Sequence, residues 1–288
     1  MSHTLMVISP HGDDAAAFCG GTVAKHAAMG WKVVMVVVTD DRKDSVGLTM
    51  DETLKLNHEE TQAGAKQLGV SELVFLGFET DTLGDVPIGK LRERIVYLFR
   101  KHRPYAVMGF DPYDRYENNL DHVRIAQATD EAYWVSCFDL HYPEHFQAGL
   151  KPFSVCERWY FGRNLIEPNQ IEDVTDHIQQ RVEALLCHKT AMRNLLNQYK
   201  LQLETWGRRM PLIEFSMDTD MRPLLERFIK ESAQAEAQKH KLPDGSMAES
   251  YRLVRFGDLE GLFQMMAEPI PGNEEPPKRS SLDAQGKK

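Results

Sequence analysis

The sequence has few cysteines, no long apolar run and no excess of positive charge. Its four cysteines are scattered and form no Cys-x-x-Cys pair, which argues against a disulfide framework or a structural zinc site. No stretch approaches the roughly 20 apolar residues that a membrane span needs. The formal net charge of −9 argues against a nucleic-acid partner, because phosphate binding requires a basic face. The N-terminus shows no signal-peptide pattern, so we expect a cytoplasmic protein that acts on a small molecule and binds no membrane.

Four apolar, strand-like runs recur in the first part of the chain. They lie at residues 5–8, 32–39, 72–78 and 105–110. Near-continuous runs of this kind suit strands that are buried on both faces of a parallel sheet. Helical patterns lie between them at residues 20–29, 51–68 and 88–102. This alternation predicts an α/β fold, with a Rossmann-like, mostly parallel sheet and helices on both faces.

The second half of the chain has a less regular pattern. Residues 156–161 and 250–256 predict strands, residues 174–203 predict one long helix or a helix pair, and residues 221–239 predict a further helix. We expect one domain over residues 1–267, with a helical extension over about 190–245. The remaining residues, 268–288, are rich in Pro, Gly, Glu, Lys and Ser, and this composition predicts a disordered tail.

The first predicted strand ends in an imidazole and two carboxylates. Residues 5–14 read LMVISPHGDD, so His11, Asp13 and Asp14 follow the apolar run directly. In open α/β sheets, ligands bind outside the carboxyl ends of the strands. This sequence therefore places groups that can bind a metal or transfer a proton where a site is expected.

A second histidine follows the fourth predicted strand. A polar loop leads from that strand to His122, at the start of a predicted helix over 123–135. Neighbouring strand ends would bring His11, Asp14 and His122 together, and three protein ligands with an open position are typical of catalytic zinc. Such an ion lowers the pKa of its water to roughly 7, and Asp13 could accept the proton. The alternative is a set of capped turns with no metal, and spacing alone leaves both open.

Two motifs carry a family resemblance. Residues 9–22 read SPHGDDAAAFCGGT and residues 119–122 read NLDH. They resemble the AHPDDE–CGGT and HPDH motifs of the LmbE-like, or PIG-L, family of metal-dependent N-deacetylases. Weaker similarities extend the resemblance over most of residues 5–256, in the stretches HEETQAGAKQLGV, FLGFETDTL, ERWYFGR and ALLCHKTAM.

The resemblance implies a catalytic domain over residues 1–267 and a role for each motif residue. His11, Asp14 and His122 would bind the metal, usually zinc, for which iron can substitute, and Asp13 would be the general base. The usual family reaction removes an acetyl group from an amine of a sugar-like molecule. The family resemblance also implies that Asp81 contacts substrate hydroxyls and that the protein is a homo-oligomer.

The chain also departs from the family pattern. Gly12 replaces the usual Pro, a change that we expect to matter little. Asn119 replaces a His that in the family polarises the substrate carbonyl or protonates the leaving group. Asn can donate a hydrogen bond to an oxyanion, but it cannot supply a proton near neutral pH. Asn57 or His58 stands where an Arg often holds the substrate, so the departures bear more on the substrate than on the metal.

Other polar residues near strand ends are candidates for substrate binding. Asp40 follows the second predicted strand, on the same side of the sheet as His11, although a solvated turn explains it equally well. Tyr113 and Arg115 precede Asn119 in a loop, and loops at strand ends often carry function.

We therefore expect a hydrolase dependent on Zn²⁺, or alternatively Fe²⁺, that cleaves the N-acetyl C–N bond of a small polar, sugar-like substrate. Asp13 would act as base and Asn119 as hydrogen-bond donor to the oxyanion. The main alternative is a metal-dependent hydratase of a small unsaturated carboxylate on the same scaffold. Iron-dependent oxygen chemistry at a 2-His-1-carboxylate site and a metal-free binding module are further hypotheses.

Overall fold

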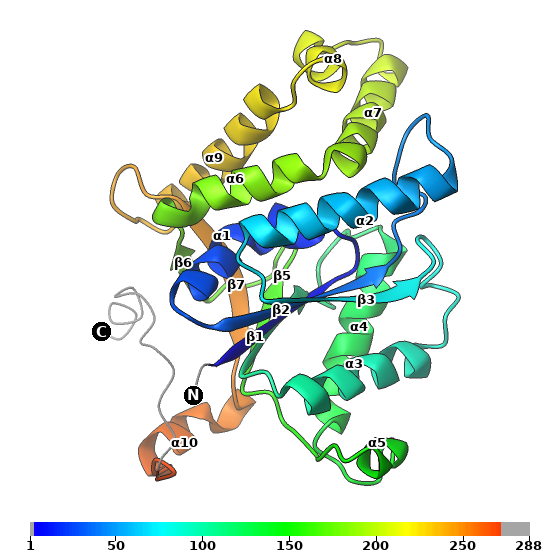
Figure 1. The fold of residues 1–288 in the computed structure, drawn as a ribbon. Helices are drawn as coiled ribbons and strands as arrows, with labels where there is room; N and C mark the ends of the chain where they lie inside the picture. Colours follow the sequence, from blue (N-terminus) through cyan, green and yellow to red (C-terminus); the bar gives the residue numbers. More distant parts are fainter. Residues whose placement is uncertain (1–2, 272–288) are drawn as a thin grey trace.

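The computed structural model describes residues 3–271, which form a sheet covered by helices (Figure 1). The strands are β1 (Thr4–Ser9), β2 (Lys32–Thr39), β3 (Glu72–Phe78), β4 (Ala106–Phe110), β5 (Glu157–Phe161), β6 (Gln170–Asp173) and β7 (Ala248–Val254). The α-helices are α1 (Asp14–Ala28), α2 (Met50–Gln67), α3 (Ile88–His102), α4 (Leu120–Val135), α5 (Glu144–Gln147), α6 (Ile178–Cys187), α7 (Lys189–Thr205), α8 (Pro211–Asp218), α9 (Arg222–Lys239) and α10 (Glu260–Met266).

The sheet has the order β3-β2-β1-β4-β5-β7-β6. The first five strands in this order are parallel, and β7 pairs antiparallel with both β5 and β6. The predicted Rossmann-like, mostly parallel sheet is therefore confirmed. The strand order reverses between β1 and β4, so their carboxyl ends border the crevice where such sheets bind ligands.

Strand β2 shows why the sheet is buried on both faces. Its side chains alternate between two apolar cores: Val33, Met35 and Val37 belong to one, and Val34 and Val36 to the other. Figure 1 shows α1, α2 and α6 over one face and α3 and α4 over the other. A continuous β-branched run is what such a strand requires, because both of its faces lack contact with water.

Several boundaries differ from the expectation. Helix α1 begins at Asp14 rather than at residue 20, and it is kinked at Cys19, whose backbone is not helical (φ −142°, ψ 17°). The expected helix over 174–203 is a pair, α6 and α7, which meet at His188. The short strand β6 and helix α8 were not predicted, because segments of four and eight residues carry little periodicity.

The expected helical extension corresponds to α7, α8 and α9. In Figure 1, α7 and α9 extend away from α6 and α8 joins their far ends. Of the expected tail, residues 272–288 lie outside the described residues. Within residues 3–271, we find no helix that is both long enough and apolar enough to cross a membrane.

Candidate active site

His11, Asp14 and His122 meet at the crevice between the ends of β1 and β4. His11 lies in the loop after β1, Asp14 is the first residue of α1, and His122 lies in the first turn of α4. All three are buried, and their side chains could hold one metal ion together. The structure thus brings together the three residues that the sequence analysis proposed as ligands, from segments more than 100 positions apart.

One donor atom from each of these residues lies within 4.8 Å of the other two, and the two oxygens of Asp14 each face one histidine. His11 Nδ1 is 3.2 Å from His122 Nε2 and 3.3 Å from Asp14 Oδ2, and His122 Nε2 is 3.4 Å from Asp14 Oδ1. Bond lengths of about 2.0–2.1 Å in a tetrahedral zinc site separate neighbouring donors by about 3.3 Å. Two imidazole nitrogens and a carboxylate oxygen at this spacing fit such an ion, with one position left open.

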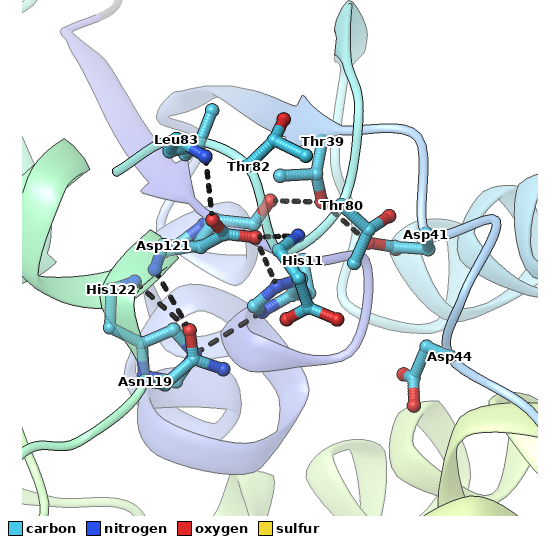
Figure 2. A network of polar contacts seen from close by, with 12 residues as sticks. His11, Thr39, Asp41, Asp44, Thr80, Thr82, Leu83, Asn119, Asp121 and His122 are labelled. Atoms are coloured by element: carbon cyan, nitrogen blue, oxygen red, sulfur yellow. Dashed lines mark hydrogen bonds and ion pairs between the residues drawn. The ribbon is translucent and has the colours of Figure 1, made fainter. Parts of the chain in front are cut away.

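The outer nitrogen of His11 faces a fully buried carboxylate. Its Nε2 lies 3.3 Å from Asp121 Oδ2 (Figure 2). Asp121 also accepts hydrogen bonds from the backbone N–H groups of Asp81 (2.7 Å) and Leu83 (3.0 Å). Carboxylates in this position orient a metal-binding histidine and set its tautomer. Asp121 therefore belongs to the site.

Asn119 is the N-cap of α4, because its Oδ1 accepts hydrogen bonds from the backbone N–H groups of Asp121 (2.9 Å) and His122 (3.4 Å). This cap places His122 at the start of the helix. The His122 ring stacks on Phe110, with 4.0 Å between ring centroids, and its Nδ1 lies 3.2 Å from Glu117 Oε2. Packing and hydrogen bonds thus both orient His122.

The charges of the three candidate ligands depend on one another. Burial opposes ionisation of Asp14, but the nearby His122 and His11 nevertheless hold the pKa of Asp14 below its usual range. Burial also opposes the charged form of His122, but Asp14 raises the pKa of His122 to about 9. For Asp13 the balance is the opposite: burial, with the negative charge of Asp14 adding to it, raises the pKa of Asp13 well above its usual range, and the opposing effect of His11 is smaller. A carboxylate with a raised pKa is a stronger base.

The loop that carries His11 is fixed by a second buried carboxylate. Asp41 Oδ2 accepts a hydrogen bond from the Gly12 N–H (2.7 Å), and Asp41 Oδ1 accepts one from Thr39 Oγ1 (2.6 Å). A Cβ atom at residue 12 would overlap Thr61 Oγ1 and approach Asp41 Oδ2 to 3.1 Å. The expectation that Gly12 in place of Pro matters little is therefore wrong, since Pro would lose the N–H and enter occupied space.

A cavity of about 770 Å³ opens over the candidate metal site. Asp13, Asn119 and Asp81 line it together with the three candidate ligands, so the structure brings these predicted residues into one space. Asp81 is exposed and has a left-handed backbone (φ 61°), a conformation that Asp tolerates better than most residues.

Three of the expected substrate-binding residues lie outside the lining of this cavity. Asp40 Oδ1 lies 3.1 Å from Thr80 Oγ1, and Asp40 Oδ2 lies 2.7 Å from Arg42 Nε. The Asp40 carboxylate therefore stabilises the loop after β2. Tyr113 is 66% exposed, and Arg115 is an exposed residue whose carbonyl accepts a hydrogen bond from Asn164. The direction of a loop side chain depends on contacts that strand-end position alone does not predict.

Asn57 has a structural role in this chain. Its Nδ2 donates to the backbone carbonyls of Asp41 (2.8 Å) and Asp44 (3.1 Å), so it braces the loop after β2. Asp44, which was not predicted, lines the cavity and accepts a 2.6 Å hydrogen bond from Asn194 of α7. Glu117 and the cavity-lining Arg163 were not predicted either. The signals for them were their position in loops after strands and, for Arg163, the family-like stretch ERWYFGR.

The family model described as PIG-L, GlcNAc-PI de-N-acetylase, matches residues 6–133, which include both motifs. The diacetylchitobiose deacetylase of Thermococcus kodakarensis is 30% identical over 194 residues, or 65% of this chain and 69% of that relative. The chain belongs to the PIG-L family. The expected family of N-deacetylating enzymes is thereby confirmed.

Solved structures of this PIG-L fold extend the comparison beyond the matched residues. The N,N′-diacetylchitobiose deacetylase of Pyrococcus horikoshii has a TM-score of 0.71 at 22% identity, covering 91% of this chain and 86% of that one. The 4-carboxy-2-hydroxymuconate hydratase of Pseudomonas putida has a TM-score of 0.63 at 18% identity, covering 88% and 96%. At these identities the similarity shows a shared fold. The two solved proteins, a deacetylase and a hydratase, catalyse different reactions on that fold.

Proposed function

We propose that this PIG-L protein is a metal-dependent hydrolase that removes an acetyl group from an amine of a small polar, sugar-like substrate. The observation that carries the proposal is the buried cluster of His11, Asp14 and His122, with Asp13 in the same cavity. The similarity to a diacetylchitobiose deacetylase supports the sugar-like substrate. The cytoplasmic location and homo-oligomeric state expected from the sequence remain part of this proposal.

The metal would be Zn²⁺, with Fe²⁺ as the alternative, held by His11 Nδ1, His122 Nε2 and a carboxylate oxygen of Asp14. When bound, such an ion supplies Lewis-acid polarisation of the acyl oxygen and lowers the pKa of a water molecule. Asp121, which faces the outer nitrogen of His11, would keep the inner nitrogen of that ring directed at the ion.

Asp13 is the group that moves the proton in this proposal. Its carboxylate accepts a proton from the water that attacks the carbonyl carbon, and it returns that proton to the nitrogen as the C–N bond breaks. The products are acetate and a free amine. The raised pKa of Asp13 suits both steps, because the group must bind a proton and then release it.

Asn119 would stabilise the oxyanion by hydrogen bonding. Its Oδ1 is held by two backbone N–H groups at the start of α4, so the rotation of the carboxamide is restricted and its Nδ2 is left to donate. A donor that is oriented before the reaction stabilises the developing negative charge without further rearrangement. Asp81 and Asp44, which also line the cavity, would accept hydrogen bonds from substrate hydroxyl groups.

The proposal is tested with purified protein reconstituted with Zn²⁺ or Fe²⁺ and supplied with N-acetylglucosamine, N,N′-diacetylchitobiose and an unsaturated dicarboxylate. Release of free amine and acetate is the expected result. Asp13→Asn should retain the metal and lose about 10²–10⁴-fold in rate. His11→Ala should lose both metal and activity. Asp40→Asn is the matched control, because Asp40 lies outside the cavity lining. Hydration of the dicarboxylate without amine release would favour the hydratase instead.

A further inference from the structure

The two candidate metal-binding histidines differ in how their outer nitrogens are held. We infer that Glu117 is a positioning residue that holds His122 ready for the metal, and that Arg163 holds Glu117 in place from the cavity side. This inference rests on the proposed function for the presence of a metal. It concerns residues outside both sequence motifs.

Glu117 uses both carboxylate oxygens to define the start of α4. Oε1 accepts a hydrogen bond from the Asn119 backbone N–H (2.9 Å), and Oε2 lies 3.2 Å from His122 Nδ1. Its side chain is only 4% exposed, so water competes little for these contacts. A carboxylate at Nδ1 requires that nitrogen to carry the hydrogen, and this leaves the Nε2 lone pair free to bind a metal.

Asp121 provides the contrast. It faces the outer nitrogen of His11, it is fully buried, and its oxygens accept hydrogen bonds from backbone N–H groups in the loop after β3. Backbone donors within a folded loop hold this carboxylate rigidly. Glu117 has one backbone donor, the Asn119 N–H, and its other oxygen, which faces His122, is held by the flexible side chain of Arg163.

Arg163 connects Glu117 with the cavity. Its Nε lies 3.2 Å from Glu117 Oε2, and its guanidinium lies over the Phe18 ring, 5.4 Å from the ring centroid. Both Arg163 and Phe18 line the cavity, and the Arg163 side chain is 49% exposed. A change at residue 163 therefore acts on the orientation of His122 through one intervening carboxylate.

The fold of this region has supports that do not involve the Glu117 side chain. Phe110 stacks on the His122 ring, and Asn119 caps α4 through its own side chain. Loss of the Glu117 carboxylate should therefore leave the packing of His122 intact. The hydrogen of the imidazole would then no longer be held on Nδ1. We expect weaker metal binding with little change in the stability of the metal-free protein.

The test compares Glu117→Leu, Glu117→Gln and Arg163→Leu with the wild type. The Zn²⁺ dissociation constant is measured by competition with a chromogenic chelator. The absorption spectrum of the Co²⁺-loaded protein reports the coordination of the metal. The melting temperature of the metal-free protein shows whether each variant folds normally. Glu117→Leu should weaken Zn²⁺ binding about 10–100-fold and alter the Co²⁺ spectrum. Glu117→Gln, whose amide oxygen still accepts from His122, should recover part of the loss, and Arg163→Leu should show a smaller loss. Glu204→Leu, on the surface of α7, is the control.

The outcomes separate the inference from the proposed function. If Glu117→Leu binds Zn²⁺ as tightly as the wild type, with an unchanged Co²⁺ spectrum, the inference is wrong and the proposed function stands. A loss of affinity that follows a fall in the metal-free melting temperature would also overturn it, because the role would then be structural. If Glu117→Leu does not fold, Arg163→Leu decides by the same criteria. A wild type that binds neither ion would overturn the proposed function and this inference with it.

Discussion

At the scale of single residues, Gly12 occupies a position where the space for a side chain is already filled. Thr61 Oγ1 stands where a Cβ would lie, and the Gly12 N–H is bonded to Asp41. We expect Gly12→Ala to destabilise the protein by about 1–3 kcal/mol, the usual cost of overpacking. Thr61→Ala removes the obstructing hydroxyl, so the double variant should recover part of this loss. Chemical unfolding of the two single variants and the double variant measures the coupling, and strictly additive losses would contradict the explanation.

His188 should make stability depend on pH. Burial between α6 and α7 lowers the pKa of its imidazole to about 4, and its ring packs against Gly64 of α2. In the unfolded chain the His188 imidazole is protonated below about pH 6.5, whereas in the folded chain it stays neutral until the pH falls to about 4. The free energy of unfolding should therefore fall as the pH falls through this window, by up to about 3 kcal/mol.

The variant His188→Gln checks this prediction, because Gln is polar and does not titrate. Urea unfolding between pH 7 and pH 4 should show a shallower loss of stability for His188→Gln than for the wild type. An equal slope for both proteins would assign the pH dependence to other groups.

At the scale of elements, the kink in α1 depends on a carboxylate from the distant strand β7. Glu249 accepts hydrogen bonds from the backbone N–H groups of Gly21 (3.0 Å) and Thr22 (2.8 Å), which follow the non-helical Cys19. It also accepts a hydrogen bond from Arg181 Nη1 of α6 (2.9 Å). These bonds satisfy the backbone donors at the start of the second half of α1. Glu249 thus holds the helix that carries Asp14 against both β7 and α6.

We expect Glu249→Ala to lower the free energy of unfolding by about 3–5 kcal/mol, because two N–H groups lose their acceptor and the part-buried Arg181 loses its carboxylate partner. Glu183→Ala is the control, since the Glu183–Arg222 ion pair is exposed and should contribute at most about 1 kcal/mol. Equal losses in the two variants would argue against a special role for the Glu249 network.

At the scale of the whole molecule, a metal that binds only the native state should stabilise the entire domain. The three candidate ligands come from two βα connections, so the site does not exist in the unfolded chain. At a free metal concentration of 100 times the dissociation constant, binding adds about 2.7 kcal/mol to the free energy of unfolding. Chelation should therefore lower the melting temperature by several degrees.

Calorimetry with and without chelator measures this shift, and His11→Ala provides the control. The variant should show no metal-dependent change in melting temperature. A shift of similar size in both proteins would mean that the stabilising ion binds elsewhere.

The sequence by itself determined the parallel part of the sheet and the candidate metal ligands. Strands β2 and β3 were predicted with their observed bounds, because each is a near-continuous apolar run of strand length. Strand β2 is buried on both faces as expected, whereas β3 lies at the edge of the sheet and is only half-buried. The bounds of α3 were also predicted as observed, from its helical periodicity and the following Pro. His11, Asp14 and His122 could be identified because the ends of parallel strands share one edge of the sheet and because the two motifs resemble those of a known family.

Only the tertiary structure decided which polar loop residues join the site. Asp44 and Arg163 line the cavity, and Glu117 contacts the candidate ligand His122. Asp40 instead bonds to Thr80 in a neighbouring loop, and Tyr113 faces water. The direction of such a side chain depends on partners far away in the sequence, such as Asn194 for Asp44. Burial patterns and strand ends locate a site along the chain, but long-range hydrogen bonds and packing select the side chains that form it.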